Sequence, residues 1–502
     1  MDTKKLRQKI LDLAIRGKLA PQDPNDDPAS VLIEKIRAEK ERLIKEKKIK
    51  RDKNESYIYR SDKSYYEKFA DGTVKCIDEE IPFEIPESWE WCRLNTILSK
   101  LTDGTHHSPV NVPVGDYMYI TAKNIKSNGV LLKDITYVSK EIHNEIYARC
   151  NPEKGDILYI KDGATTGIAT INSLSEPFSM LSSVALLKPI KELNAHYLLR
   201  FLQSPACYNS TRDNMKGVGI TRVTLTQMER WLVPVAPLKE QEHIVEKIDD
   251  LFIAITDVDI NKEKLSEYIK NAKSKILDLA IRGKLVPQDP NDEPASVLLE
   301  RIESERRESK KKTPKTTDNS HYTFDIPESW VWCRLEDVCG FENGFAFSSN
   351  DYKTIGIPLI RISNIIDGSI ELNNCVYIDE SEFIPQRYQI EKGDLLIAMS
   401  GATTGKMGIY KSIDPAYLNQ RVGCIKSKNN QLLSNLYRNY FLLLQTDEIL
   451  KLAHGGAQPN ISSNKINSIE IPLPPINEQR RIVKRIEEIF ASLDEIANSI
   501  KA

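Results

Sequence analysis

Two glycine-rich segments come closest to a known chemical motif in this chain. Residues 401–407 read GATTGKM, and residues 163–169 read GATTGIA. A phosphate-binding loop of the Walker type needs four residues between its glycines, and then lysine followed by serine or threonine. Here only three residues separate the glycines, Met407 stands in the hydroxyl position, and the first copy has no lysine. Nucleotide binding by these loops is therefore not expected.

Other catalytic and metal-binding patterns are absent from the sequence. No GxGxxG opens a helix after a strand, and no Asn/Asp-Pro-Pro-aromatic motif of amino-methyltransferases occurs. None of the eight cysteines stands in a CxxC pair or a Cys/His cluster, so we expect reduced cytosolic thiols and no zinc. His106 and His107 are adjacent in LTDGTHHSP, either as a polar loop pair or as a ligand-facing pair. We expect a non-catalytic chain with no metal and no cofactor of its own.

The bulk composition is that of a globular protein with several domains. The chain has 502 residues, of which 40% are hydrophobic and 28% charged, and its formal net charge is −2. This length predicts about two to four domains. A net charge near zero gives no global basic field, which argues only weakly against nucleic acid because charge can be local. No run of about 18 apolar residues occurs, so no membrane span is expected.

Much of the chain occurs twice. ILDLAIRGKL at residues 10–19 recurs at 276–285, and IPESWEWCRL at 85–94 recurs as IPESWVWCRL at 326–335. PLKEQEHIVEKI from Pro237 matches PINEQRRIVKRI from Pro475. The copies lie 238 to 266 residues apart, and this period is too long for a solenoid. They indicate a duplicated domain with two similar halves.

The central block carries an apolar heptad pattern. Its apolar positions alternate in steps of four and three residues, which is typical of a coiled coil. They are Ile244, Ile248, Leu251, Ile255, Val258, Leu265, Ile269, Ala272, Ile276 and Leu279, with Lys262 as the one polar break. The tail repeats the first part of this pattern and the head repeats the last part. The chain is therefore a cyclic duplication, and we expect tail and head to form a split helix antiparallel to the central one.

Six segments are expected along the chain. They are an N-terminal helical region (1–50), a linker (51–80), a first variable domain (81–236), a central helical region (237–312), a second variable domain (320–474) and a C-terminal helix (475–502). Short apolar runs bounded by Gly, Asn and Pro predict an α+β fold in each variable domain, with helices at 196–203 and 433–444.

Proline at the first helical position predicts a second helix in each repeated block, starting within residues 26–30 and 291–296. The charged run AEKERLIKEKKIKRDK in the first copy is either a solvated face or a docking surface for a partner.

The order of these blocks resembles the specificity subunit of type I restriction-modification systems. Two dissimilar domains, each carrying GDxL, GATTG and a proline-rich turn before a Glu-Gln helix, alternate with near-identical blocks carrying LAIRGKL and PQDPND. The resemblance covers essentially the whole chain. It implies an α+β fold with two mixed α/β target recognition domains, joined by long helices in an antiparallel coiled coil with pseudo-two-fold cyclic duplication.

The resemblance also implies a cytoplasmic, non-catalytic subunit that binds double-stranded DNA. Each target recognition domain would read one half of a bipartite asymmetric site, and each added heptad would lengthen the spacer by roughly three base pairs. Two methyltransferase subunits would methylate adenine N6 with S-adenosylmethionine, and two restriction/translocase subunits would use ATP and Mg²⁺. The alternative is the specificity subunit of a two-chain type II enzyme, which neighbouring genes would distinguish. A non-DNA scaffold is a third hypothesis.

Candidate DNA contacts are polar or aromatic residues in loops of the two variable domains. Arg and Lys suit guanine, Asn and Gln suit adenine, and small hydroxyls suit phosphate. In the first domain the candidates are Thr105, His106, His107, Lys123, Asn124, Lys161, Thr165, Thr166 and Arg222. In the second they are Asn343, Phe345, Arg361, Ser363, Asn364, Thr403, Thr404, Lys406, Asn419, Gln420, Arg421, Gln458 and Asn460. Each could instead be an ordinary polar loop residue.

The two copies divide these candidates into matched and differing positions. Asn124 matches Asn364, and the two threonines of each GATTG loop match each other, so we expect these residues to contact phosphate or to hold the fold. Lys161 stands against Met399, and Lys123 stands against Ser363. Differing positions are the better candidates for sequence choice.

Overall fold

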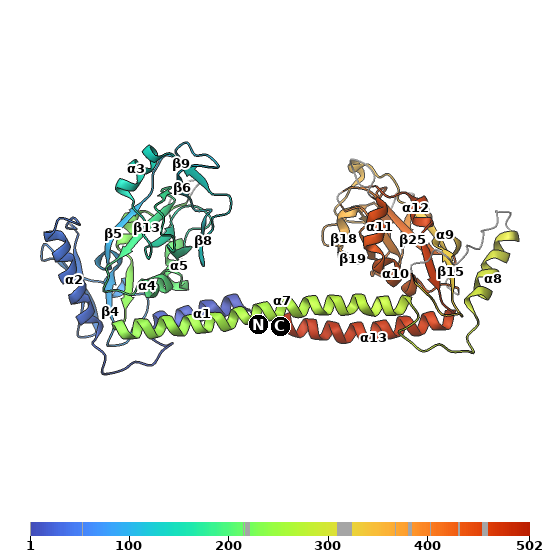
Figure 1. Cartoon of the computed structure of the whole chain (residues 1–502), viewed down its shortest axis with the longest axis horizontal. Helices are drawn as coiled ribbons and strands as arrows, with labels where there is room; N and C mark the ends of the chain where they lie inside the picture. Colours follow the sequence, from blue (N-terminus) through green and yellow to red (C-terminus); the bar gives the residue numbers. More distant parts are fainter. Residues whose placement is uncertain are drawn as a thin grey trace. The chain divides into compact units, whose positions relative to one another are not determined.

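The structure is a computed structural model that describes residues 2–52, 54–213, 215, 221–308, 324–366, 368–379, 384–401, 403–429, 432–453 and 460–501. The chain divides into two compact units, Met1–Asn261 and Lys262–Ala502 (Figure 1). Each unit is described by itself. Helix α7 (Leu238–Ile281) contributes its first part to the first unit and its last part to the second.

In the first unit, α1 (Thr3–Ile15) lies against the first part of α7 (Figure 1). Arg7 donates to the Thr256 hydroxyl at 2.8 Å, whereas Asp26, beyond the end of α1, pairs with Lys239 at 3.3 Å. The start of α1 thus meets the later part of this stretch, so the two helices run antiparallel. Their seam contains Ile10, Ile244, Ile248 and Ile255, which the heptad pattern predicts, and also Ala14, which it does not.

The second unit pairs α13 (Ile476–Lys501) with the last part of α7 in the same sense. Lys273 pairs with Asp494 at 2.6 Å, and Arg481 pairs with Asp292, just beyond α7, at 2.6 Å. The buried side chains of Ile482 and Ile486 belong to the core of this unit. Within each unit the helix pair is therefore antiparallel, as the sequence predicts.

The second helices begin one residue later than expected. They are α2 (Ala29–Lys45) and α8 (Ala295–Glu308). Pro28 has a helical φ of −64° but an extended ψ of 158°, so it caps the helix from outside. The first helical N–H of each helix donates to a serine carbonyl of an IPESW motif, Ala29 to Ser88 and Ala295 to Ser329, both at 2.9 Å.

The first variable domain is built on two small sheets. One has the order β11-β10-β13-β5, from β5 (Leu98–Asp103), β10 (Ile157–Ile160), β11 (Ala169–Ile171) and β13 (Val184–Pro189). The other has the order β12-β6-β9, from β6 (Tyr117–Ile120), β9 (Thr136–Val138) and β12 (Ser179–Met180). Two short pairs complete it, β4 (Glu90–Arg93) with β14 (Leu232–Val235) and β7 (Ile125–Lys126) with β8 (Gly129–Val130). Its helices are η2 (Leu94–Ile97), α3 (Lys140–Arg149), α4 (Ala195–Leu202), α5 (Pro205–Asp213) and α6 (Leu225–Glu229).

The expected linker at residues 51–80 is folded, which corrects the prediction. It forms an antiparallel sheet of β1 (Ser56–Ser61), β2 (Ser64–Phe69) and β3 (Val74–Cys76), followed by η1 (Asp78–Glu80). Asp62 takes the left-handed backbone, φ 57°, that the tight turn between β1 and β2 needs. Ile58 and Glu67 point inward and are buried, so this sheet belongs to the core of the first unit.

The second variable domain has a larger sheet with the order β16-β25-β22-β23-β19-β18 and a four-stranded sheet with the order β20-β17-β24-β21. The strands are β16 (Cys339–Asn343), β17 (Ile357–Ile360), β18 (Ile365–Ile366), β19 (Gly368–Ile370), β20 (Val376–Ile378), β21 (Gln389–Ile390), β22 (Leu395–Ala398), β23 (Met407–Ile409), β24 (Ala416–Leu418) and β25 (Val422–Ser427). A separate pair joins β15 (Val331–Arg334) to β26 (Glu470–Leu473). The helices are α9 (Leu335–Val338), η4 (Ser349–Asp351), η5 (Ile362–Asn364), η6 (Gln386–Tyr388), α10 (Asn435–Leu444), α11 (Thr446–Ala453) and α12 (Ser463–Asn467). The helices predicted at 196–203 and 433–444 are confirmed as α4 and α10 within two residues.

The repeated motifs meet one another inside each unit. Trp89 of the first IPESW motif donates its indole N–H to Glu240 at 2.8 Å, and Trp330 of the second donates to Glu478 at 2.9 Å. Burial raises the pKa of both carboxyl groups. The glutamine that follows each glutamate is also buried, and Gln241 accepts from Asn194 N–H at 3.2 Å. Much of the repeated sequence therefore joins each variable domain to its helical frame.

Replacing Gly17 or Gly283 with alanine is expected to lower the free energy of unfolding by roughly 1–3 kcal/mol. Both glycines have positive φ, 64° and 65°, and an added Cβ would overlap the ring of Pro86 or Pro327. Gly72 is the matched control, because its φ is 89° but nothing lies within 4 Å of an added Cβ. Urea denaturation should show a smaller loss for Gly72→Ala. Equal losses would mean that the contact with the IPESW proline is unimportant.

Candidate nucleic-acid interface

A cluster of charges surrounds Asp103 at the end of β5. Its carboxylate is almost fully buried, with 3% of the side chain exposed, and it accepts from Arg149 at 2.6 Å. His106 lies 3.3 Å and Lys161 3.5 Å from the same carboxylate. Lys161 also lies 3.3 Å from Asp162. The cluster thus joins the end of α3, the loop after β5 and the loop after β10.

The first GATTG loop follows β10 and lies beside Arg222. Asp162 forms an isolated β-bridge with Arg222, and Gly163 N–H donates to the Thr221 carbonyl at 2.9 Å. The loop after β6, which carries Lys123, is tied to the same place because Leu181 N–H donates to the Ile120 carbonyl at 3.0 Å. The structure therefore brings together the loops that carry the candidates of the first domain.

The second domain gathers its candidate loops through equivalent backbone hydrogen bonds. Phe345 N–H donates to the Leu418 carbonyl at 2.8 Å, and Asn419 N–H donates to the Ile360 carbonyl at 3.1 Å. Met399 N–H donates to the Arg421 carbonyl at 2.9 Å, and Ser400 forms an isolated bridge with Asn460. Phe345 also packs against Phe347 and Tyr388, with ring centroids 4.9 and 5.2 Å away. The second domain thus has an aromatic cluster around Phe345, where the first domain has the charges around Asp103.

Several matched candidates are occupied within the fold. Asn124 accepts from Thr121 N–H at 3.0 Å and donates to the Leu131 carbonyl at 3.1 Å, and Asn364 makes the same pair of bonds to Arg361 and Glu371. The hydroxyls of Thr166 and Thr404 donate to the first glycine carbonyl of their own loops. These four side chains are buried and hold the turns, which is one of the two roles expected for matched positions.

The remaining candidates differ in exposure. Lys161 and Asn419 are also buried, and their contact with DNA stays a prediction. Thr105, Arg361 and Thr403 are partly exposed. The exposed candidates are His106, His107, Lys123, Thr165, Arg222, Asn343, Phe345, Ser363, Lys406, Gln420, Arg421 and Asn460. Gln458 lies outside the described residues.

Comparison with known proteins places this geometry in a family. The model of the family described as "Type I restriction modification DNA specificity domain" matches residues 86–269 and 327–502. The chain belongs to this family of specificity subunits. Both matches contain one variable domain and the helix that follows it, so the duplication in the sequence corresponds to two specificity domains.

Related specificity subunits come from bacteria and archaea. The present chain is 29% identical to the type I restriction enzyme EcoAI specificity subunit of Escherichia coli, over 99% of its own length and 90% of that protein. It is 24% identical to the MjaVIII specificity subunit of Methanocaldococcus jannaschii, over 81% of this chain and 87% of that protein. A solved structure from a study of complex assembly and conformational transition of the type I R-M system superposes with a TM-score of 0.57 at 18% identity, covering 84% and 94% of the two chains. That likeness supports the fold.

Arg149 is a functional candidate of the specificity subunit that the sequence prediction missed. It lies in the last turn of α3, and 52% of its side chain is exposed beside the exposed His106. Arg387 of the second domain stands, like Arg149, six residues before a Gly-Asp pair. An arginine at the same position of both halves was the available signal. The contact with Asp103 could not be read from the sequence, because it joins segments far apart along the chain.

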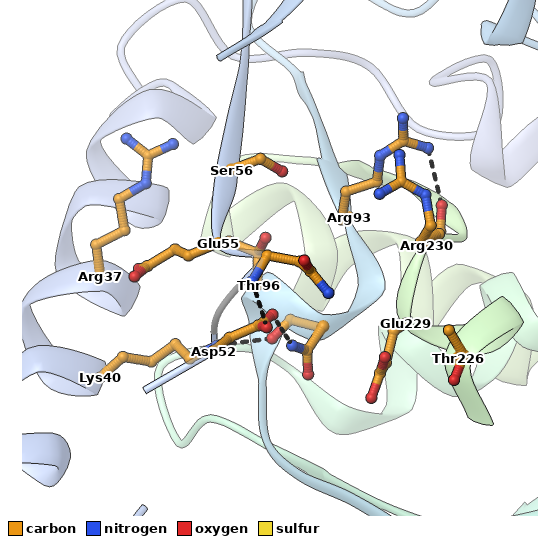
Figure 2. Close-up of a pocket in the computed structure, with 12 residues that line it drawn as sticks. Arg37, Lys40, Asp52, Glu55, Ser56, Arg93, Thr96, Thr226, Glu229 and Arg230 are labelled. Carbon is orange, nitrogen blue, oxygen red and sulfur yellow. Dashed lines mark hydrogen bonds between the residues drawn. The ribbon is translucent and has the colours of Figure 1, made fainter. Parts of the chain in front are cut away.

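A crevice in the first unit is lined by polar and charged side chains, among them Arg37, Lys40 and Asp52 (Figure 2). Lys40 of α2 donates to the Asn95 carbonyl at 2.7 Å, and Asn95 donates to Asp52 at 2.5 Å. Burial lowers the pKa of Lys40. Because these groups bond to one another, we interpret the crevice of the specificity subunit as the join between α2 and the first variable domain.

The residues that the structure describes contain neither a cluster of metal ligands nor a helix suited to a membrane. No group of three His, Cys, Asp or Glu side chains there could hold a metal ion. Among those residues, no helix has both the length and the apolar content that crossing a bilayer requires.

Proposed function

We propose that this specificity subunit reads a bipartite, asymmetric site in double-stranded DNA, with one variable domain at each half-site. The supporting observation is that the two variable domains share equivalent backbone hydrogen bonds but carry different side chains on them. Thr105 N–H donates to Met180 as Phe345 N–H donates to Leu418, both at 2.8 Å. Lys161 N–H likewise donates to Ser183 as Met399 N–H donates to Arg421, at 3.0 and 2.9 Å.

The side chains on this frame differ between the domains. Asp103 is replaced by Asn343, Thr105 by Phe345, and Lys161 by Met399. Base edges in the major groove are distinguished by hydrogen-bond donors, acceptors and the thymine methyl group. Two surfaces with different donors and apolar groups therefore suit two different half-sites, and the target is not a palindrome.

Repeated and exposed residues fit two copies of one partner. Asp23 and Asp289 each accept the N–H of the asparagine two residues on, at 2.9 Å, so the PQDPND loops have the same turn in both units. The exposed residues that are identical in the two loops are Lys18 and Lys284, Pro21 and Pro287, Gln22 and Gln288, Asp23 and Asp289, Pro24 and Pro290, and Asn25 and Asn291. The same surface presented twice suits two copies of the same subunit.

We infer that these partners are two methyltransferase subunits, which two restriction/translocase subunits join. In this proposal S-adenosylmethionine, ATP and Mg²⁺ are bound by the partners, which carry out adenine N6 methylation and cleavage. This chain supplies DNA recognition without catalysis, and the complex works in the cytoplasm.

Sequencing of methylated adenines in the native strain and in a strain without this chain tests the proposal. The expected result is an asymmetric bipartite motif that is methylated only when the chain is present. Unchanged methylation after removal of the chain, or a palindromic motif, would contradict it.

Insertion of seven residues into α7 near Lys262 is expected to lengthen the gap between half-sites by roughly three base pairs, because a heptad adds about 10 Å of helix. The half-site sequences should stay the same. Insertion of two residues is the control, because it turns the apolar positions beyond it by about 200° and should abolish site recognition. Methylome sequencing measures both. An unchanged gap after the seven-residue insertion would refute the spacer role of α7.

A further inference from the structure

Arg149 is held in a fixed position at the surface of the first variable domain. Its guanidinium donates to the buried Asp103 carboxylate at 2.6 Å, and His106 lies 3.2 Å from the same guanidinium nitrogen. Yet 52% of the Arg149 side chain is exposed, against 7% for Lys161, the other cation of the cluster. Arg149 is therefore the cation that can reach a ligand, and Lys161 is not.

An arginine held in this way has the geometry that guanine recognition needs. A guanidinium has five N–H donors in a rigid fork, and one salt bridge uses only part of them. The donors that remain can bond guanine O6 and N7 together, which is the commonest specific contact in the major groove. Because Asp103 restrains the side chain before binding, less conformational entropy is lost on binding.

The second domain has an arginine at the same place with a different support. Arg387 donates to the Tyr388 hydroxyl at 2.6 Å and stacks over its ring at 4.6 Å. Asn343 replaces Asp103, and Met399 replaces Lys161. The carboxylate that restrains Arg149 is thus missing from the second domain, so the two arginines are held differently and are suited to different contacts.

We propose that Arg149 is a specificity-determining residue that reads a guanine in the half-site of the first domain, and that Asp103 is its positioning residue. The inference rests on the proposed function, because it requires that this domain lies on DNA. A phosphate contact by Arg149 is the competing interpretation, and the two differ in what they predict. A base reader affects one base pair, whereas a phosphate contact affects all sequences alike.

The test uses the full chain assembled with its methyltransferase subunits and duplexes that carry the methylated motif. Each base pair of both half-sites is substituted in turn, and affinities are measured by fluorescence anisotropy at several salt concentrations. Arg149→Ala should weaken binding to the motif by about 10- to 100-fold and remove discrimination at one G·C pair, with an unchanged salt slope. Arg149→Lys should keep general DNA affinity without restoring discrimination, because an ammonium group lacks the planar fork.

Two further variants separate positioning from folding. Asp103→Asn should reduce discrimination at the same base pair while thermal denaturation shows an intact chain. Arg387→Ala is the matched control, because it should leave discrimination in that half-site unchanged.

An Arg149→Ala complex that keeps its base preferences would overturn the inference. A uniform loss on all duplexes, with the salt slope reduced by about one, would show a phosphate contact and overturn it too. If the unmodified complex shows no preference for its motif, the proposed function itself fails.

Discussion

Replacing Arg93 with methionine lowers the free energy of unfolding by about 3–5 kcal/mol, the usual cost of leaving a buried charge without its partner. Only 8% of the Arg93 side chain is exposed, and it donates to Glu67 at 2.6 Å and to Glu80 at 2.7 Å. It also donates to the Arg230 carbonyl at 2.8 Å. This arginine therefore ties the three-stranded sheet to the first variable domain. Its loss leaves the fully buried Glu67 carboxylate with the Ser56 hydroxyl at 2.6 Å and the half-exposed Arg230 at 3.5 Å.

Arg334 is the matched control, because it stands at the same position of the WCRL repeat. Its side chain is 52% exposed, and its ion pair with Glu336 is 3.8 Å long. Arg334→Met should therefore cost less than about 1 kcal/mol. Urea denaturation followed by tryptophan fluorescence gives both values. The double variant Glu67→Met with Arg93→Met should recover part of the loss, since no fully buried carboxylate remains, and Arg230, which loses its 3.5 Å ion pair, is 47% exposed. Equal costs for the two single variants would contradict this account.

The same network predicts a pH dependence with a definite sign. Burial by itself raises the pKa of Glu67, but hydrogen bonds from Arg93 and Ser56 outweigh it and hold the pKa below its usual value. The pKa of Glu80 is also lowered, because the effect of burial is outweighed by hydrogen bonds from Lys75 and Arg93. A carboxyl group whose pKa is lowered by folding stabilises the fold above its unfolded pKa, about 4.5, and loses that effect as the pH falls through the folded pKa. The difference between the native chain and Arg93→Met should therefore be largest near pH 7 and shrink below about pH 4.

The frame of this protein could be predicted from the sequence because it depends on local periodicity. The spacing of Ile244, Ile248 and Ile255 indicates the helical seam, and the structure buries all three. The sheet at residues 56–76 could not be predicted because its strands, SYIYRS and SYYEKF, mix tyrosine with serine and charged residues and have no regular apolar alternation, a pattern that also fits an exposed linker. The sheet is held by contacts between residues far apart in the sequence, among them the ion pair between Glu67 and Arg93 and the packing of Ile58 in the core.

The candidate site could be predicted only in part, because residue type does not determine exposure. Lys123 and Lys161 are both lysines in loops that follow strands, yet one is exposed and the other is buried beside Asp103. Asn124 is a suitable adenine reader by type, but its amide closes a turn. Tertiary contacts make these choices. The matched positions mostly hold the backbone frame, and the differing positions that remain exposed are the ones left to contact a ligand.

Substitution of Gly344 by alanine, which adds one methyl group, tests the backbone frame of the second domain. At Gly344, directly after strand β16, an added Cβ would overlap the backbone of Asn419, whereas at Gly340, within β16, nothing lies within 4 Å of one. Gly344→Ala must therefore displace Asn343 and Phe345 from the loop after β24, to which Phe345 N–H is bonded at 2.8 Å. Under the proposed function Asn343 and Phe345 each contact a base, and loss of two such contacts worth about 1–3 kcal/mol each predicts an affinity at least roughly 100-fold lower for the half-site of this domain.

Gly340→Ala, which adds the same methyl group to open space, should leave that affinity within about twofold. Both variants are measured in the assembled complex on duplexes with one half-site altered at a time, so that an effect on the second domain is separated from an effect on the first. If Gly344→Ala binds as the native chain does, the loop after β16 does not contact DNA, and Phe345 is only a surface aromatic. If Gly344→Ala weakens both half-sites alike, the substitution has unfolded more than the loop, and the frame is less independent in its two copies than their separate hydrogen bonds indicate.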